Sequence, residues 1–202
     1  SGLSSAENDA EDINTFLEKV GFETKLLLSP GLRDIIKSVS DFKEGVDSDT
    51  VSVVYFAGHG LQIESTNFLV PVDAKISISE EIPYFCFNAS DLLINTTVES
   101  DNLHIVILDS CSNNPFPSGI RGVKSGLARM TAPVGTLIAF STSPNMAANE
   151  KTGERNSLYT KHLLRELNVP NSSVERIFKN TRTRVIKESN GRQIPWEESS
   201  LH

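Results

Sequence analysis

The chain has 202 residues, of which 38% are hydrophobic and 22% charged, and these values are typical of one compact globular domain. Its net charge of −7 does not favour nucleic-acid binding, and the sequence has no Lys/Arg cluster that would provide a basic surface. No apolar run approaches the roughly 20 residues of a membrane-spanning helix. Two cysteines, Cys86 and Cys111, are too few for a disulfide framework, which favours a reducing compartment. We therefore expect a cytoplasmic protein with no nucleic-acid or membrane partner.

Hydrophobic spacing predicts helices and strands in alternation along the chain. Apolar residues at helical spacing, or a capping box of Ser172 and Glu175, predict helices at residues 6–20, 32–42, 158–167 and 172–188. Runs rich in β-branched and aromatic residues predict the main strands at residues 22–28, 51–57, 103–108 and 136–141. Shorter pieces are expected to be extended at 67–72 and 84–87, helical at 90–97, and loop-like at 112–135 and 142–156.

Three of the expected strands, at 51–57, 103–108 and 136–141, are mostly apolar and lack polar alternation. Such strands are typical of a parallel sheet covered by helices on both faces, so we predict an α/β sandwich with a mainly parallel central sheet. Active sites in these sheets lie beyond the carboxyl ends of the strands. His59 follows the first of these strands and Cys111 follows the second, and adjacent parallel strands would bring the two residues together.

A cysteine thiol beside a histidine imidazole suits nucleophilic catalysis. The thiolate attacks a carbonyl carbon, and the imidazole transfers protons, including the one that the leaving amine requires. We expect Gly58 and Gly60 to form a tight turn that keeps His59 accessible. The backbone N–H groups of Gly60 and Cys111 are candidates to hold the oxyanion of a tetrahedral intermediate.

The paired motifs "VVYFAGHG" and "VILDSC" resemble the signatures of caspase-like cysteine proteases, which are clan CD peptidases, and particularly of metacaspases, paracaspases and their bacterial relatives. The segments "NFLVPVDA", "ILDSCSNNPF", "APVGTLIAFSTSP", "GERNSLYTKHLL" and "GRQIPWEESSL" also match, so the resemblance covers nearly the whole chain. It implies a caspase-like three-layer α/β sandwich, peptide-bond hydrolysis, and a catalytic dyad of His59 and Cys111.

The resemblance also implies how residues 1–202 are organised as a single peptidase domain. Residues 1–141 would correspond to a large subunit that contains the dyad, 142–156 to a processing loop, and 157–202 to a small subunit. Relatives begin with an apolar strand ahead of the first helix, and that strand is absent from this sequence.

Two aspartates suggest which substrates are cut. Asp109 lies two residues before Cys111, so it could point into the pocket beside the nucleophile. Asp9, in "ENDAED", matches the family's "NDA" aspartate, and in metacaspases and paracaspases these two positions line the S1 pocket and select Arg or Lys. Paired carboxylates favour a basic P1 side chain through charge-assisted hydrogen bonds. We therefore expect protein or peptide substrates with Arg or Lys at P1, and self-cleavage after Lys151 or Arg155.

Other interpretations stay open at this stage. A catalytically silent pseudoprotease that acts as an interaction module is the alternative function, whereas an α/β-type serine hydrolase is disfavoured because no GxSxG motif occurs. Asp109 could brace a loop, and Asp9 could simply favour a helix N-terminus. Core or structural roles are expected for Cys86, His104, His162 and Trp196, with a pocket-wall role open for Trp196.

We expect neither a metal nor another cofactor. The sequence contains no CxxC or HExxH motif and no convincing cluster of oxygen ligands. Because metacaspases often need calcium, the resemblance leaves calcium activation open, although nothing in the sequence supports it. It leaves homodimerisation open as well.

Overall fold

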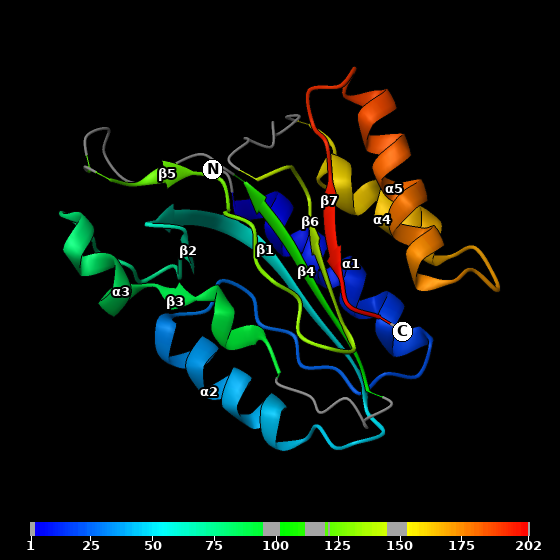
Figure 1. The fold of residues 1–202 in the computed structure, drawn as a ribbon, viewed down its shortest axis with the longest axis horizontal. Coiled ribbons are helices and arrows are strands. Elements are labelled where there is room, and N and C mark those ends of the chain that lie inside the picture. The colour runs from blue at the N-terminus through cyan, green and yellow to red at the C-terminus, as the bar shows by residue number, and fades with distance from the viewer. Residues whose placement is uncertain (1–2, 95–101, 112–119, 121, 145–152, 202) are drawn as a thin grey trace.

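The structure is a computed structural model that describes residues 3–94, 102–111, 120, 122–144 and 153–201. Helices and strands are interspersed along it, although not in the regular alternation that the sequence predicted (Figure 1). In chain order the elements are α1 (Leu3–Lys19), α2 (Leu32–Glu44), β1 (Val51–Ile63), β2 (Thr66–Leu69), η1 (Ser79–Glu81), α3 (Ile82–Phe85), β3 (Phe87–Asn88), η2 (Ala89–Leu92), β4 (Leu103–Cys111), β5 (Lys124–Ser125), β6 (Thr136–Phe140), α4 (Leu158–Leu167), α5 (Val174–Glu188) and β7 (Trp196–Ser199).

Three parallel strands form the centre of the sheet. β4 pairs in parallel with β1 on one side and with β6 on the other. The strand order is β3-β2-β1-β4-β6-β7, in which β2, β3 and β7 are antiparallel to their neighbours, and β5 pairs with β1 beside this path. The predicted α/β fold with a mainly parallel central sheet is therefore confirmed.

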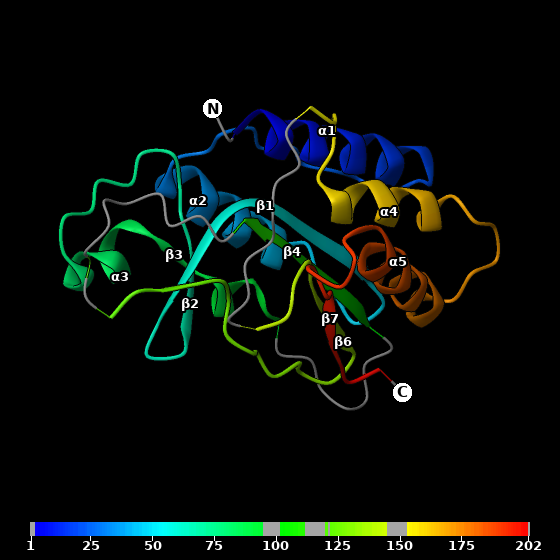
Figure 2. The ribbon, with the colours of Figure 1, turned by 90° about the horizontal axis from the view of Figure 1, so that it is seen from above.

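Helices cover both faces of this sheet. Figure 2 shows α1, α4 and α5 side by side on one face. Successive residues of β4 serve the two layers, as strand geometry requires: Leu108 packs in one core cluster with Ile35 of α2, whereas Ile107 packs in another with Ile13 of α1. Fully burying side chains of this size contributes about 1.5–3 kcal/mol each. The alternation thus fixes which β4 side chains can meet α1 and α4.

Segment 22–28 does not form the strand that its sequence suggested. Its residues adopt no regular secondary structure, and no strand in the described parts of the chain hydrogen-bonds to it. Its Leu26 and Leu28 stay 39% and 43% exposed. A strand needs a neighbour for its backbone N–H and C=O groups, and the prediction was wrong because pattern alone does not supply one.

Two smaller boundaries also differ from expectation. Residues 84–87 are not extended throughout, because 84 and 85 belong to the single-turn helix α3. Pro83 lies in the first positions of this helix, and its fixed φ angle suits that place. The last helix starts from Ser173, whose hydroxyl accepts the N–H of Arg176, rather than from Ser172. The helix expected at 90–97 is the 3-10 helix η2 at its start, and its remainder lies outside the described residues.

No helix within the described ranges is long and apolar enough to cross a membrane.

Candidate active site

The pairing of β1 with β4 brings the two expected catalytic positions together. Its register runs from Val51 opposite Leu103 to His59 opposite Cys111. Neighbouring strands lie about 4.8 Å apart, so the backbones of His59 and Cys111 are direct neighbours. The side chain of Cys111 lies outside what the structure describes.

His59 does not lie in a turn, as its flanking glycines suggested, but inside the long strand β1. The turn follows only at Glu64 and Ser65, whose φ angles are +47° and +67°. From Gly60 opposite Leu69 onward, β1 pairs with β2 in the antiparallel sense. Continuous backbone pairing therefore overrides the turn tendency of the two glycines.

Gly60 is required by close packing rather than by a turn. A Cβ atom at this position would lie 2.3 Å from Oγ of Ser110 and 2.8 Å from Cδ2 of Leu127. Both distances are far below van der Waals contact, so a side chain here would push the strand ends apart. The oxyanion role expected for the N–H groups of Gly60 and Cys111 stays a prediction.

The ring of His59 is half-buried and keeps one nitrogen without a partner. Its Nδ1 atom is buried, and no group in the described part of the chain hydrogen-bonds to it. Because strand side chains alternate between faces, His59 lies on the same face as Tyr55, whose OH is 2.6 Å from Oγ1 of Thr160 in α4. A buried ring nitrogen without a partner is rare, and a catalytic role is one accepted reason for it.

The two expected S1 aspartates, which come from α1 and β4, meet at one residue, Ser157. The Ser157 hydroxyl donates to Oδ2 of Asp109 at 2.5 Å, and its backbone N–H donates to Oδ1 of Asp9 at 3.0 Å. Thr160 Oγ1 adds a hydrogen bond to Asp109 at 2.9 Å. Asp9 and Asp109 are only 2% and 3% exposed, so the structure places both at one buried acidic site.

Burial makes this site an unfavourable place for two negative charges. Burial, and secondly the charge of Asp109, raise the pKa of Asp9 to about 7. Burial also raises the pKa of Asp109, against the opposing effect of the hydroxyls of Ser157, Ser141, Thr160 and Tyr55. Carboxyls coupled in this way titrate as a pair. We infer that the pair retains a proton near neutral pH and that an incoming cation would favour its release.

Sequence reasoning missed Ser157 and Thr160, which lie at the N-cap and in the first turn of α4. Ser157 is the N-cap of α4, and its hydroxyl accepts the N–H of Thr160 at 3.0 Å. The positive end of the helix therefore faces Asp109. A serine just before an apolar helical pattern is a recognisable cap signal, but nothing in the sequence says which carboxylate that cap meets.

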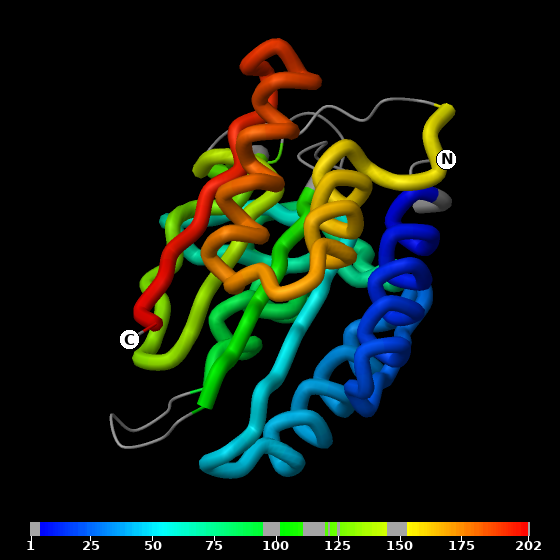
Figure 3. The backbone as a smooth tube through the Cα atoms, turned by 90° about the vertical axis from the view of Figure 1, so that its right-hand side faces the viewer, coloured from blue at the N-terminus to red at the C-terminus, as the bar shows by residue number. Residues whose placement is uncertain are grey.

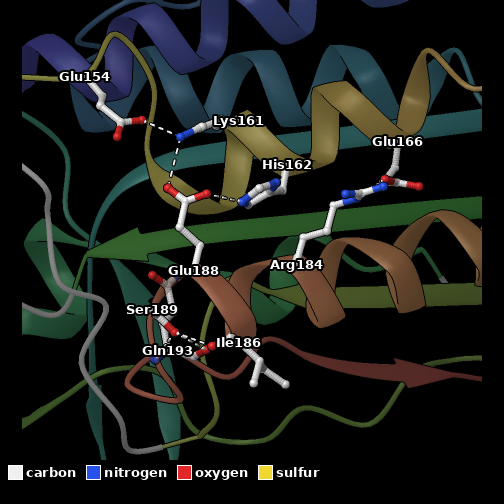
Figure 4. Close-up of polar contacts among 9 residues, drawn as sticks. All are labelled: Glu154, Lys161, His162, Glu166, Arg184, Ile186, Glu188, Ser189 and Gln193. Carbon is white, nitrogen blue, oxygen red and sulfur yellow. Dashed lines mark hydrogen bonds and ion pairs between the residues drawn. The ribbon is translucent and has the colours of Figure 1, made fainter.

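Ion pairs join α4 to the neighbouring helix α5 (Figure 4). Glu188 at the end of α5 accepts from Nζ of Lys161 at 3.0 Å and lies 2.8 Å from Nε2 of His162. Farther along, Arg184 of α5 pairs with Glu166 of α4. These contacts hold α4, and with it the Ser157 cap, in a fixed orientation.

The residues expected in core or structural roles lie where those roles require. Cys86 is buried, and burial raises the pKa of its thiol to about 12, so it stays protonated. His104 is buried with its Nδ1 2.6 Å from Oγ of Ser52, and His162 contacts Glu188. Trp196 packs against the core, and Cζ of the Arg129 guanidinium lies 5.5 Å from the centre of the Trp196 ring.

The two candidate self-cleavage residues differ in what can be said of them. Lys151 lies outside the described residues. Arg155 is described, and its guanidinium donates to both carboxylate oxygens of Asp12 in α1. In the part of the chain that the structure covers, no group of three or more His, Cys, Asp or Glu side chains is placed to hold a metal ion.

Comparison with known proteins adds the family. A family model of the caspase domain matches residues 1–202. The chain belongs to the caspase domain family. Its relatives include the mucosa-associated lymphoid tissue lymphoma translocation protein 1 of Homo sapiens and the homolog of that protein in Mus musculus, each 25% identical over 103 residues. Each match covers 51% of this chain and 12% of the relative, so this caspase domain spans a small part of their length.

Family membership confirms the resemblance to caspase-like cysteine proteases and, with the sheet topology, the caspase-like α/β sandwich. Within this domain, His59 of β1 lies opposite Cys111 of β4 in the sheet. Asp109 lies two residues before Cys111 and forms the acidic site with Asp9.

Proposed function

We propose that this caspase domain is a cysteine endopeptidase that cuts peptide bonds after Arg or Lys. The main support is one juxtaposition. The strand register that sets His59 opposite Cys111 also sets Asp109 opposite Ala57. Asp109 lies two residues before Cys111 on β4, and Ser157 joins it to Asp9. The proposed nucleophile, proton-transfer group and cation-binding site would thus lie together at the carboxyl ends of β1 and β4.

In the proposed mechanism the Cys111 thiolate attacks the carbonyl carbon of the scissile bond. The N–H groups of Gly60 and Cys111 would stabilise the oxyanion that forms. The His59 imidazolium would then give its proton to the leaving amine as the C–N bond breaks, and later activate the water that hydrolyses the thioester. The half-buried ring, whose Nδ1 has no hydrogen-bond partner among the described residues, suits a group that must exchange protons.

Selection of the P1 side chain follows from the charge of the acidic site. A guanidinium or ammonium group would form charge-assisted hydrogen bonds with Asp9 and Asp109 and make their full ionisation favourable. A P1 aspartate would add a third carboxylate to the site and be repelled. The pair of carboxylates therefore favours Arg or Lys at P1. It favours Arg over Lys where the guanidinium donates from two of its edges at once.

One observation favours the silent alternative. Both carboxylates are nearly fully buried and hydrogen-bonded to Ser157 in the chain as described. An interaction module that never admits a P1 side chain would look the same. The two functions therefore need a direct test.

The test compares the wild type with Cys111→Ala on fluorogenic peptides that carry Arg, Lys or Asp at P1, with calcium and with a chelator. The endopeptidase proposal expects cleavage of the Arg and Lys peptides by the wild type only. Equal inactivity of both proteins under every condition would support the silent module. Cleavage after Asp alone would contradict the assigned S1 site.

We also propose self-cleavage in the segment that precedes α4, with Lys151 favoured over Arg155. The Arg155 guanidinium is engaged with Asp12, so cleavage after it first requires that ion pair to break. Mass spectrometry of the active wild type should find a new terminus after Lys151 that is absent from Cys111→Ala. An active protein that stays intact would contradict this.

A further inference from the structure

A short segment at residues 154–157, here called the clasp, runs beside α1 to the start of α4. It belongs to the yellow stretch near the first turns of α1 in Figure 3. Its described contacts tie it to both helices, and its last residue is Ser157.

Arg155 fastens the clasp to α1. Its Nε and Nη2 atoms donate to the two carboxylate oxygens of Asp12 at 2.9 and 2.7 Å. Nη1 donates to Oδ1 of Asn8 at 3.2 Å, and the Asn8 amide donates back to the Arg155 carbonyl oxygen at 3.1 Å. The bidentate pair and the reciprocal amide contact fix both the side chain and the backbone of Arg155.

Flanking residues complete the fastening. The Asn156 amide donates to the same Asp12 carboxylate at 2.8 Å. On the other side, Glu154 accepts from Nζ of Lys161 in α4 at 2.9 Å. The clasp is therefore attached to both of the helices that lie beside it.

The network matters more than its exposure suggests. Arg155 and Asp12 side chains are 56% and 27% exposed, and an isolated ion pair at that exposure contributes little. Here the pair is bidentate and shares its atoms with two amide side chains, which is the geometry in which surface pairs are effective. The hydrogen bond from Arg155 also lowers the pKa of Asp12, so the pair stays charged near neutral pH.

The residue positioned by this network is Ser157. Its N–H binds Asp9 and its hydroxyl binds Asp109, so the spacing of the two carboxylates depends on where the clasp lies. A shift of about 1 Å in a positioning group is enough to impair a site. Because the acidic site would bind the P1 side chain rather than the scissile bond, such a shift should weaken substrate binding more than it slows the chemical step.

We propose that Asp12 and Arg155 are positioning residues for the recognition of a basic P1 side chain. Their ion pair holds the clasp so that Ser157 keeps Asp9 and Asp109 side by side. Neither residue is assigned a contact with substrate. The inference rests on the proposed function, because it concerns the same acidic site.

Steady-state kinetics test the positioning role with Asp12→Asn, Arg155→Gln and the double variant, on a P1-arginine peptide. Each single variant should raise KM about tenfold, which is about 1.4 kcal/mol, and leave kcat within about twofold. The double variant should be no worse than either single, because the two side chains act as one pair. The matched control is Asp41→Asn, which removes the exposed 3.0 Å ion pair with Lys25 and should leave KM unchanged.

Three kinetic results would overturn the inference. They are an unchanged KM in Asp12→Asn, additive losses in the double variant, and a lower KM in either single variant. The last result would make the clasp a lid over the acidic site rather than its support.

Binding measurements separate this inference from the proposed function. Cys111→Ala, alone and combined with Asp12→Asn, is titrated by calorimetry with a P1-arginine peptide and a P1-aspartate peptide. The arginine peptide should bind more tightly, and Asp12→Asn should weaken its Kd about tenfold. If this holds while the wild type cleaves nothing, the endopeptidase proposal fails and the inference stands. If the arginine peptide binds no better than the aspartate peptide, there is no basic-selective site and the inference falls.

Discussion

The paired strands β1 and β4 have a histidine near each end of their pairing, and the two histidines have opposite surroundings. Near the amino end, His104 is registered with Ser52, and its Nδ1 lies 2.6 Å from the serine hydroxyl. At the carboxyl end, His59 is registered with Cys111, and its Nδ1 has no hydrogen-bond partner within the described ranges. Burial lowers the pKa of His104, so that ring stays neutral in a satisfied pair.

The difference shows how one pair of strands separates stability from function. Buried polar groups that satisfy one another stabilise a single structure. Polar groups that are left unpaired, or that crowd like charges together as Asp9 and Asp109 do, lower the stability of the fold. Such groups are retained where a ligand or a reaction can use them. The amino end therefore looks structural and the carboxyl end functional, and substitutions at each end test this.

The largest effect is expected for His59→Gln. Loss of the proton-transfer group should lower kcat on a P1-arginine peptide about 1000-fold. The melting temperature should stay within about 2 °C, because Nδ1 of His59 has no hydrogen bond to lose among the described residues. Kinetics and thermal melting monitored by circular dichroism measure the two quantities. Retention of more than a tenth of the wild-type kcat would show that the two ends do not differ as proposed.

Asp109→Asn should lower kcat/KM for P1-arginine and P1-lysine peptides by roughly 30–150-fold, because a charged hydrogen bond contributes about 2–3 kcal/mol. The amide can still accept the Ser157 hydroxyl, so the fold should persist. A P1-glutamine peptide provides the comparison, and its rate should change far less. Equal losses on all three peptides would mean that Asp109 supports the site without selecting charge.

At the opposite end, Ser52→Ala should affect stability alone. It leaves the buried Nδ1 of His104 without its partner, which costs about 1–3 kcal/mol. Urea unfolding measures this cost, while kcat and KM should match the wild type. A catalytic defect without a stability loss would contradict the structural assignment of this end.

The smallest effect is a pH dependence caused by Asp9. Its pKa is about 7 in the folded chain against 3.8 for the free group, so the folded state holds an extra proton between these values. The free energy of unfolding should therefore fall as pH rises from about 4 to 7 on account of this group. Asp9→Asn should remove that fall.

Urea titrations of wild type and Asp9→Asn at pH 5 and pH 8 measure this difference. The gap is the free energy of unfolding of the variant minus that of the wild type, and it should rise by about 1–2 kcal/mol from pH 5 to pH 8. The full pKa shift of Asp9 would correspond to roughly 4 kcal/mol, and the expected value is smaller because the proton is shared with Asp109. A constant gap between the two pH values would place the proton elsewhere.

Much of the fold could be predicted from local pattern. The cores of β1, β4 and β6 are apolar runs, and α1, α2 and α4 follow helical spacing. Segment 22–28 shows the limit, since its pattern suits a strand but a strand also needs a neighbour. The glycines around His59 show another limit, because Gly60 is fixed by its contact with Ser110 and Leu127 rather than by a turn.

The site was predictable only in part. Strand-end position predicted the meeting of His59 and Cys111, while the position of Asp9 was inferred from the family resemblance. Ser157 and Thr160 could not be found this way, because their hydrogen bonds to Asp109 form only when α4 packs against the sheet. Contacts between distant segments produce no recognisable spacing pattern in the sequence.

The Ser157 hydroxyl has two duties at once, since it caps α4 through the N–H of Thr160 and binds Asp109. A mutation that redirects P1 preference by removing this hydroxyl would also remove a helix cap, at a cost of about 1 kcal/mol. Only serine or threonine offers both a donor and an acceptor on so short a side chain. Evolution or engineering of a new cleavage preference here would therefore have to begin with a compensating stabilisation of α4.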